Sequence, residues 1–199
     1  MIQDLWSTAT FYGNLSGESK LAWEKIMRKR EIPKNEFFVP EGKIPKTVGF
    51  VLSGLFSQYY CSDEGETVIK KFFHEGNFMA SLSALVNNDP SLFFIKALEN
   101  SSILEFSFGA FKELTIQYAD IAALYIKYLE KNWVVEKELL EISFRHDDAS
   151  TRYLNFLKTY PGLDARVKQH EIASYLGITP TQLSRIRSEL SNSSKSQHM

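Results

Sequence analysis

The part of this 199-residue chain that most constrains its folding is residues 169–190, QHEIASYLGITPTQLSRIRSEL. Its spacing of small, apolar and capping residues suits two short helices that cross at a tight turn. Ala173 is small where the helices would cross, and Gly177 permits a left-handed turn. Thr179-Pro180 supplies an N-cap followed by proline at the first helical position. The segment therefore predicts a helix-turn-helix.

The second predicted helix has an inner apolar stripe, Leu183, Ile186 and Leu190, which leaves its opposite face free to enter a DNA major groove. Arg185 lies on that face, and an arginine can donate two hydrogen bonds to guanine, so Arg185 is the candidate base-reading residue. The remaining candidates are phosphate or flanking contacts. The predicted DNA contacts are Thr179, Thr181, Gln182, Ser184, Arg185, Arg187 and Ser188. The alternatives are a helical hairpin with solvated arginines, or a motif that folds without binding DNA.

Charge and composition limit the other functions. Residues 151–199 hold seven Lys/Arg against three Asp/Glu, so the basic part of the chain coincides with the motif. The single Cys61 excludes a disulfide or a site held by several thiolates of one chain, and the four histidines are dispersed. We expect no metal, no cofactor and no enzymatic activity. The absence of a long apolar run or a secretory signal predicts a cytoplasmic protein without a membrane partner.

Residues 32–108 contain short alternating or apolar runs separated by glycines, which predicts an antiparallel roll. Asp63-Glu64-Gly65 is a candidate hairpin turn, with glycine at the positive-φ position. A short amphipathic helix is expected ahead of the roll, at residues 17–29. The predicted fold class is therefore α+β: an N-terminal antiparallel β-roll of jelly-roll type with flanking helices, a long helix and a C-terminal helix-turn-helix.

Residues 111–145 lack proline and glycine and change to a helical period, which predicts one long helix. Eight side chains follow a 3-4 spacing typical of a coiled-coil seam, and Asn132 among them would fix the register of two strands. The expected seam is Tyr118, Ile121, Tyr125, Tyr128, Asn132, Val135, Leu139 and Ile142. Self-association is the preferred interpretation, because a helix of this length would extend past its own domain; packing on the chain's own sheet is the alternative.

The predicted domains are a sensory roll at 1–112, a dimerisation helix at 113–146, a DNA-binding domain at 147–190 and a disordered tail at 191–199. His146-Asp147-Asp148 is a candidate hinge, with an aspartate capping a helix at 149–159. The tail SNSSKSQHM is polar and rich in serine, which is typical of disorder.

The order of these parts resembles the Crp/Fnr family of bacterial transcription regulators. The strongest similarities are LSRIRSEL and the earlier segments PEGKIPKTVGFVLSGLFSQYY and FHEGNFMASLSAL. The resemblance covers nearly the whole chain and implies a homodimer, joined through the long helices, that binds a two-fold symmetric DNA site. It also implies that an effector in the roll reorients the DNA-binding domains.

The chain departs from that family at its cyclic-nucleotide cassette. Ala80-Ser81 and Ser91-Leu92 stand where the family has Gly-Glu and an Arg followed by Ser or Thr, and residues 78–94 contain no Arg or Lys. A desolvated phosphate needs a cation or several donors, so cyclic AMP is not expected to bind. A surviving effector pocket would be apolar and lined by Phe78, Met79, Ser81, Leu82, Ser91, Leu92 and Phe93. Three alternatives stay open: these side chains fill the roll, a diverged pocket still responds to a cyclic nucleotide, or the chain is a ligand-binding or scaffold dimer with a vestigial motif.

Overall fold

The computed structural model describes residues 2–196, with side chains through Asn192. The chain divides into two compact units. Unit 1 comprises residues 1–60 and 71–137, and unit 2 comprises residues 61–70 and 138–199.

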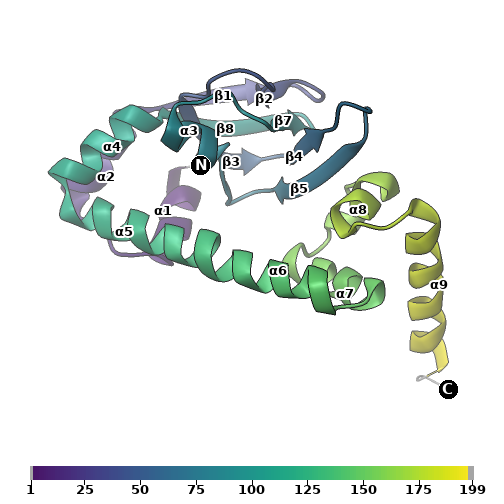
Figure 1. The fold of residues 1–199 in the computed structure, drawn as a ribbon. Helices are drawn as coiled ribbons and strands as arrows, with labels where there is room; N and C mark the ends of the chain where they lie inside the picture. Colours follow the sequence, from purple (N-terminus) through teal and green to yellow (C-terminus); the bar gives the residue numbers. More distant parts are fainter. Residues whose placement is uncertain (1, 197–199) are drawn as a thin grey trace. The chain divides into compact units, whose positions relative to one another are not determined.

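The strands form two antiparallel four-stranded sheets (Figure 1). One sheet has the order β1-β8-β3-β6, and the other has the order β2-β7-β4-β5. The strands are β1 (Met27–Ile32), β2 (Phe37–Val39), β3 (Thr47–Ser53), β4 (Phe56–Cys61), β5 (Thr67–Phe73), β6 (Phe78–Met79), β7 (Phe94–Ala97) and β8 (Ser101–Ser107). The predicted combination of antiparallel sheets and helices is confirmed.

The interior of the roll is filled by apolar side chains. Both faces of β8 are buried: Ile103 packs into the roll, whereas Leu104 and Phe106 pack with the helices outside it. The roll cluster consists of Ile32, Phe38, Val39, Val51, Phe56, Phe73, Met79, Ile95, Ala97 and Ile103. Ile95 and Ala97 of β7 alternate because successive side chains of a strand point to opposite faces, whereas Phe38 and Val39 are adjacent in β2, whose register is irregular.

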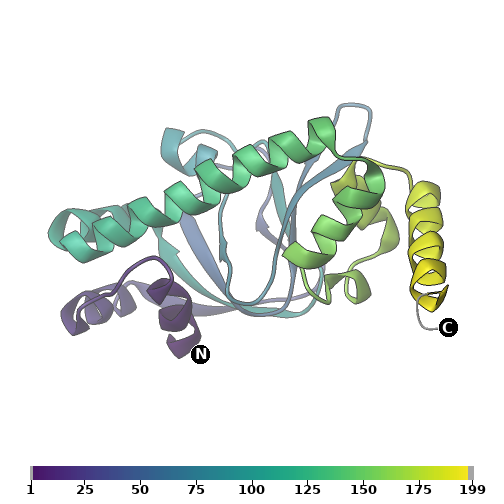
Figure 2. The same ribbon diagram turned by 90° about the horizontal axis from the view of Figure 1, so that it is seen from below.

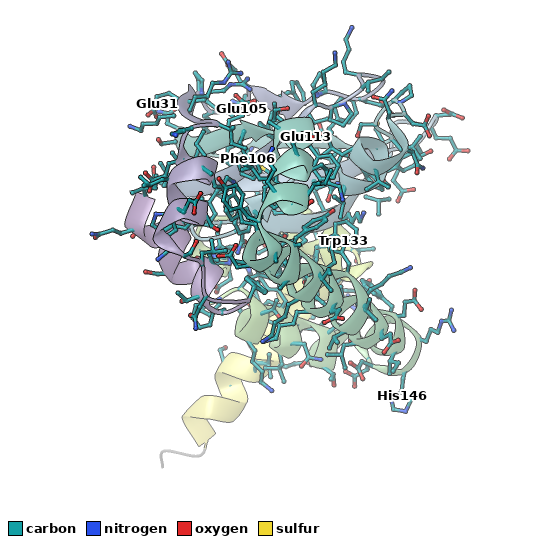
Figure 3. The ribbon with its side chains drawn as sticks, turned by 90° about the vertical axis from the view of Figure 1, so that its left-hand side faces the viewer. Glu31, Glu105, Phe106, Glu113, Trp133 and His146 are labelled. Atoms are coloured by element: carbon teal, nitrogen blue, oxygen red, sulfur yellow. The ribbon has the colours of Figure 1, made fainter. Side chains whose placement is uncertain are left out.

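Glu105, which is labelled in Figure 3, is a buried carboxylate. It accepts two hydrogen bonds from Arg28, at 3.0 and 2.8 Å, one from Arg30 at 3.2 Å and one from Thr47 at 2.9 Å. Burial opposes ionisation, but the hydrogen bonds and the two arginines hold the pKa of Glu105 below its ordinary value.

Helices cover the β1-β8-β3-β6 sheet around Trp23, which is buried and contacts Phe78, Phe106 and Phe111. The helices of this part are α1 (Ile2–Thr10), α2 (Gly17–Glu24), α3 (Leu82–Asn87), α4 (Phe108–Gln117) and α5 (Ala119–Leu129). The helix expected at 17–29 therefore ends at Glu24, because Met27 already pairs with Phe106 as the first residue of β1.

The single helix predicted at 111–145 is interrupted at two places. Tyr118 has extended backbone angles, φ −123° and ψ 108°, and separates α4 from α5. Asp120 then anchors the start of α5 by accepting hydrogen bonds from the Ser16 backbone N–H, at 2.8 Å, and the Ser19 hydroxyl, at 2.6 Å. Further along, α5 continues through a π-helical turn, Glu130–Val135, into α6 (Glu136–His146), as Figure 2 shows.

Unit 2 contains four further helices: α7 (Ala149–Thr159), the 3₁₀ turn η2 (Leu163–Ala165), α8 (Gln169–Leu176) and α9 (Pro180–Ser196). The predicted helix at 149–159 and its aspartate cap are confirmed, since Asp148 accepts a hydrogen bond from the Thr151 N–H at 2.7 Å. Helix α9 continues past Leu190, so residues 191–196 are helical and not a disordered tail. Residues 197–199 of that predicted tail lie outside the described residues.

Candidate functional site

Helices α8 and α9 pack through the residues whose spacing predicted them. Ile172, Ala173 and Leu176 of α8, with Leu183 and Ile186 of α9, are buried. Gly177 has φ +66° and ends α8 in the left-handed conformation, which residues with a Cβ adopt at a cost. Two rigid helices joined by a three-residue turn result.

A reciprocal pair of hydrogen bonds begins α9. The Thr179 hydroxyl accepts from the Gln182 N–H at 3.1 Å, and the Gln182 side-chain oxygen accepts from the Thr179 N–H at 2.9 Å. This capping box satisfies donors that a helix start otherwise leaves unpaired. The cap predicted at Thr179 is therefore present. The sequence interpretation placed Gln182 only among the DNA contacts and missed its capping role.

The outer face of α9 is polar and accessible. Thr181, Ser184, Arg185 and Ser188 are all exposed, on the side away from Leu183 and Ile186. Their side chains can contact a ligand without disturbing the packing of α9. A guanidinium flanked by hydroxyls on one helix face is chemically suited to base edges and phosphate oxygens.

Arg187 is placed differently from the other predicted DNA contacts. Its Nε donates to the Tyr153 hydroxyl at 3.0 Å, and its guanidinium lies 5.5 Å from the centre of the Tyr153 ring. Its Nη2 is buried without a hydrogen-bond partner among the described residues. Because the side chain packs on α7, we expect Arg187 to position α9, whereas its role as a phosphate contact stays a prediction.

Arg152 is a second positioning residue, and sequence reasoning missed it. Its Nε donates to the Leu176 carbonyl at 3.1 Å, and its Nη1 donates to the Asp147 carbonyl at 2.7 Å. The guanidinium thereby joins the candidate hinge to the end of α8, where unpaired carbonyls favour a cation. An arginine four residues after the capping Asp148 was the available signal, but its partner in α8 is distant in sequence.

Three of the seven side chains predicted to line an effector pocket, Met79, Ser81 and Ser91, are buried. Ser81 and Ser91 are buried, and the Ser91 hydroxyl donates to the Ser81 hydroxyl at 2.9 Å. Met79 is fully buried in the roll cluster, and Phe78 stacks on Trp23. Leu82 and Phe93 are half-buried, whereas Leu92 is 68% exposed and lines no interior.

These residues do not fit a cyclic phosphate. The two serines that replace the cassette bond to each other, and the segment that holds them, residues 78–94, offers no cation. A desolvated phosphate would therefore lack the charge-assisted hydrogen bonds that stabilise it.

The predicted dimer seam falls into two parts. Its first part packs on unit 1: Ile121 is fully buried, Tyr118 and Tyr125 pack on the same cluster, and Tyr128 contacts Phe78. The alternative of packing on the chain's own domain is therefore correct for this part. The last three members are exposed: Val135 by 53%, Leu139 by 64% and Ile142 by 62%.

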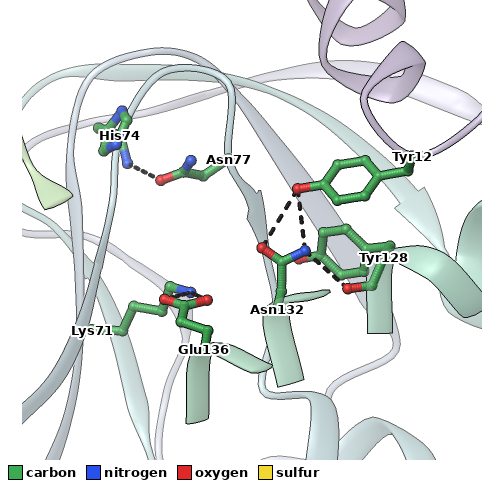
Figure 4. Close-up of polar contacts among 7 residues, drawn as sticks. All are labelled: Tyr12, Lys71, His74, Asn77, Tyr128, Asn132 and Glu136. Atoms are coloured by element: carbon green, nitrogen blue, oxygen red, sulfur yellow. Dashed lines mark hydrogen bonds and ion pairs between the residues drawn. The ribbon is translucent and has the colours of Figure 1, made fainter. Parts of the chain in front are cut away.

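Asn132 divides these two parts and bonds inside unit 1 (Figure 4). Its Nδ2 donates to the Tyr12 hydroxyl at 3.1 Å and to the Tyr128 carbonyl at 2.9 Å. One turn on, Glu136 accepts two hydrogen bonds from Lys71 Nζ, both at 3.0 Å. Burial raises the pKa of the nearby Tyr128 hydroxyl well above its ordinary value, so Tyr128 stays neutral.

Within residues 2–196, no three His, Cys, Asp or Glu side chains gather in a way that could hold a metal ion. No helix in the described part of the chain has both the length and the apolar character needed to cross a membrane.

Residues 29–118 match the family model of the cyclic nucleotide-binding domain. The regulatory protein HlyX of Actinobacillus pleuropneumoniae is 24% identical over 171 residues, which cover 81% of this chain and 70% of HlyX. FixK2 from Bradyrhizobium japonicum has a similar fold, with a TM-score of 0.70 and 18% identity over 85% of this chain and 86% of FixK2. The catabolite activator protein of Thermus thermophilus also has a similar fold, with a TM-score of 0.54 and 17% identity. The match covers 91% of this chain and 86% of the Thermus chain.

Proposed function

We propose that this chain is a regulator of the Crp/Fnr family that binds DNA as a homodimer and reads a two-fold symmetric site with α9. The observation that carries the proposal is the exposed face of α9 around Arg185, on a helix whose start is capped and whose inner side is fixed by Arg187 and Tyr153. A rigid support of this kind is what a base-reading side chain requires.

In this proposal α8 and α9 form a helix-turn-helix, and α9 is its recognition helix. Arg185 donates to guanine O6 and N7 in the major groove, and Thr181, Ser184 and Ser188 bind flanking bases or phosphates. The excess of four positive charges in residues 151–199 favours the approach of this segment to DNA.

The dimer contact is proposed for the exposed apolar side chains of the long helix. Ile126, Val134, Leu139 and Ile142 are each more than half exposed, and a second copy of the same helix would bury them. Ile121 and Tyr128 are excluded from this contact because they pack inside unit 1. The proposed dimer contact is therefore shorter than the predicted seam, and it begins at Ile126 instead of Tyr118.

The roll is proposed as a sensor domain that does not bind cyclic AMP, because its cassette residues pair with each other. We assign the chain no catalytic step, in line with the regulatory protein HlyX, and place its action in the cytoplasm, where DNA is accessible.

Selection of bound sequences from a random DNA pool tests the proposal. We expect a two-fold symmetric consensus with half-sites about 34 Å apart, or one helical turn. Replacement of Arg185 by Ala should cost about 1–3 kcal/mol on the preferred site and relax one base preference. No enrichment from the pool would overturn the proposed function.

Arg166→Ala is the matched control, since it removes the same charge from an exposed position of unit 2. Any phosphate contact of Arg166 would weaken all sequences alike and leave the consensus unchanged. If Arg185→Ala leaves the base preference unchanged while Arg166→Ala relaxes it, then Arg185 does not read a base.

A further inference from the structure

The π-helical turn at Glu130–Val135 places the rest of the helix one residue out of α-helical register. The Glu136 N–H bonds the Lys131 carbonyl, five residues back, where an α-helix would use the carbonyl four residues back. One extra residue in a turn rotates everything after it by about 100° and moves it by about 1.5 Å, relative to an uninterrupted α-helix.

The apolar side chains of this segment suit the uninterrupted helix. In that register, Val135, Leu139 and Ile142 continue the row that contains Ile121 and Tyr128. Ile126, Trp133 and Leu140 repeat every seven residues and form a second row. The π turn breaks both rows, and Val135, Leu139 and Ile142 are left exposed.

Two contacts from distant segments favour the π turn. Asn132 follows Tyr128 by four residues, and Glu136 follows Asn132 by four. Over the eight residues from Tyr128 to Glu136, an α-helix advances by about 80° beyond whole turns, whereas one extra residue in the turn brings the same eight residues to within about 20° of alignment. The π turn therefore lets Asn132 reach Tyr12 while Glu136 reaches Lys71.

We propose that this π turn is a register switch. Tyr12 and Lys71 hold the long helix in the π register, and release of these contacts lets the turn become α-helical and aligns both apolar rows. The aligned row Ile126, Trp133 and Leu140 then strengthens the contact with the second copy of the helix. An event that moves the N-terminal segment from Asn132 thereby controls the dimer, a consequence that rests on the proposed homodimer.

The register itself is tested within one chain, without DNA or a partner. In a Cys61→Ser background, cysteines are placed at Lys71 and Glu136, or at Lys71 and Val135, and each pair is joined with a short bis-maleimide. Both variants lack the contact between Lys71 and Glu136, so in both of them the Tyr12 contact alone holds the π register. The π register favours the 71–136 pair, and the α register brings residue 135 to that place. Adding Tyr12→Phe should shift the ratio of the two yields about fivefold toward 71–135, the value of one hydrogen bond.

Tyr60→Phe is the matched control, because it removes a hydroxyl from a tyrosine on β4 that has no role in this proposal. Equal ratios with and without the Tyr12 hydroxyl would overturn the switch.

Sedimentation equilibrium tests the consequence for the dimer. Tyr12→Phe should tighten self-association, and a variant that lacks Val134 should abolish this effect. Deletion of one residue makes this turn α-helical but keeps the later residues in the orientation they have now, with Glu136 facing Lys71. In this variant the helix can no longer change register. Weaker association in Tyr12→Phe would overturn the switch. A chain that stays monomeric in every variant would overturn the homodimer, while the cross-linking ratio still decides the register.

Discussion

Replacement of Arg187 by Ala distinguishes a residue that positions α9 from one that contacts phosphate. The substitution removes a hydrogen bond to Tyr153 from a charged donor, about 1.5–3 kcal/mol, and a half-buried cation–π contact, about 1 kcal/mol. It also frees a side chain whose ordering costs about 1.5–2 kcal/mol, and it removes the buried, unpaired Nη2. The net loss of local stability should be about 1–2 kcal/mol.

Amide hydrogen exchange is the appropriate measurement, because it reports the opening of individual helices. We expect faster exchange in α7 and α9 of Arg187→Ala and little change in the strands of unit 1. A double-mutant cycle with Tyr153→Phe should give a coupling of about 1 kcal/mol.

The contrary result is equally specific. If exchange is unchanged, the coupling with Tyr153 is zero, and Arg187→Ala weakens binding to all DNA sequences with a salt slope lower by about 1, then Arg187 contacts phosphate and the positioning role is refuted.

Three further predictions concern unit 1 and the dimer. Because the pKa of Glu105 is lowered in the folded chain, its contribution to stability is present above its unfolded pKa and is lost as the pH falls through the folded pKa. Glu105→Gln should therefore reduce the loss of stability in acid, measured by urea unfolding at pH 3–7. An unchanged pH profile would contradict this prediction. Cyclic AMP should leave the Tm unchanged, whereas a ligand at 100 times its Kd would add about 2.7 kcal/mol. Ile121→Ala should lower the free energy of unfolding by about 2–5 kcal/mol, and Leu139→Ala should change it by less than about 0.5 kcal/mol while weakening self-association in sedimentation. Equal effects of these two substitutions on unfolding would show that the division of the seam is wrong.

The segment 169–190 was predictable because its determinants are local. Ala173, Gly177 and Thr179 act on neighbours within a few residues, so their order in the sequence already contains the turn, the crossing and the cap. The cap at Asp148 was predictable for the same reason. The contact of Arg187 with Tyr153 was not predictable, because a helical period separates inner from outer faces but does not identify a neighbour that lies 34 positions away.

The long helix shows the opposite case. Its period correctly predicts helix over most of 119–146, but the break at Tyr118 and the π turn depend on other segments. Ser16 and Ser19 hold Asp120 from about 100 positions away, and Tyr12 holds Asn132 from 120 positions away. A window along the sequence contains none of these partners, so it predicts an unbroken seam.

By itself, then, the sequence determined the helical and strand periods, the capped and left-handed turns and the loss of cations from the nucleotide cassette, because each is written in residues close together along the chain. Only the tertiary structure decided which side of each helix is buried, that Ser81 and Ser91 satisfy each other, and where the long helix leaves its α register. The physical reason is that burial and side-chain hydrogen bonds depend on which distant residues meet, and these contacts are strong enough to override a local preference worth a few tenths of a kcal/mol to about 1 kcal/mol per residue.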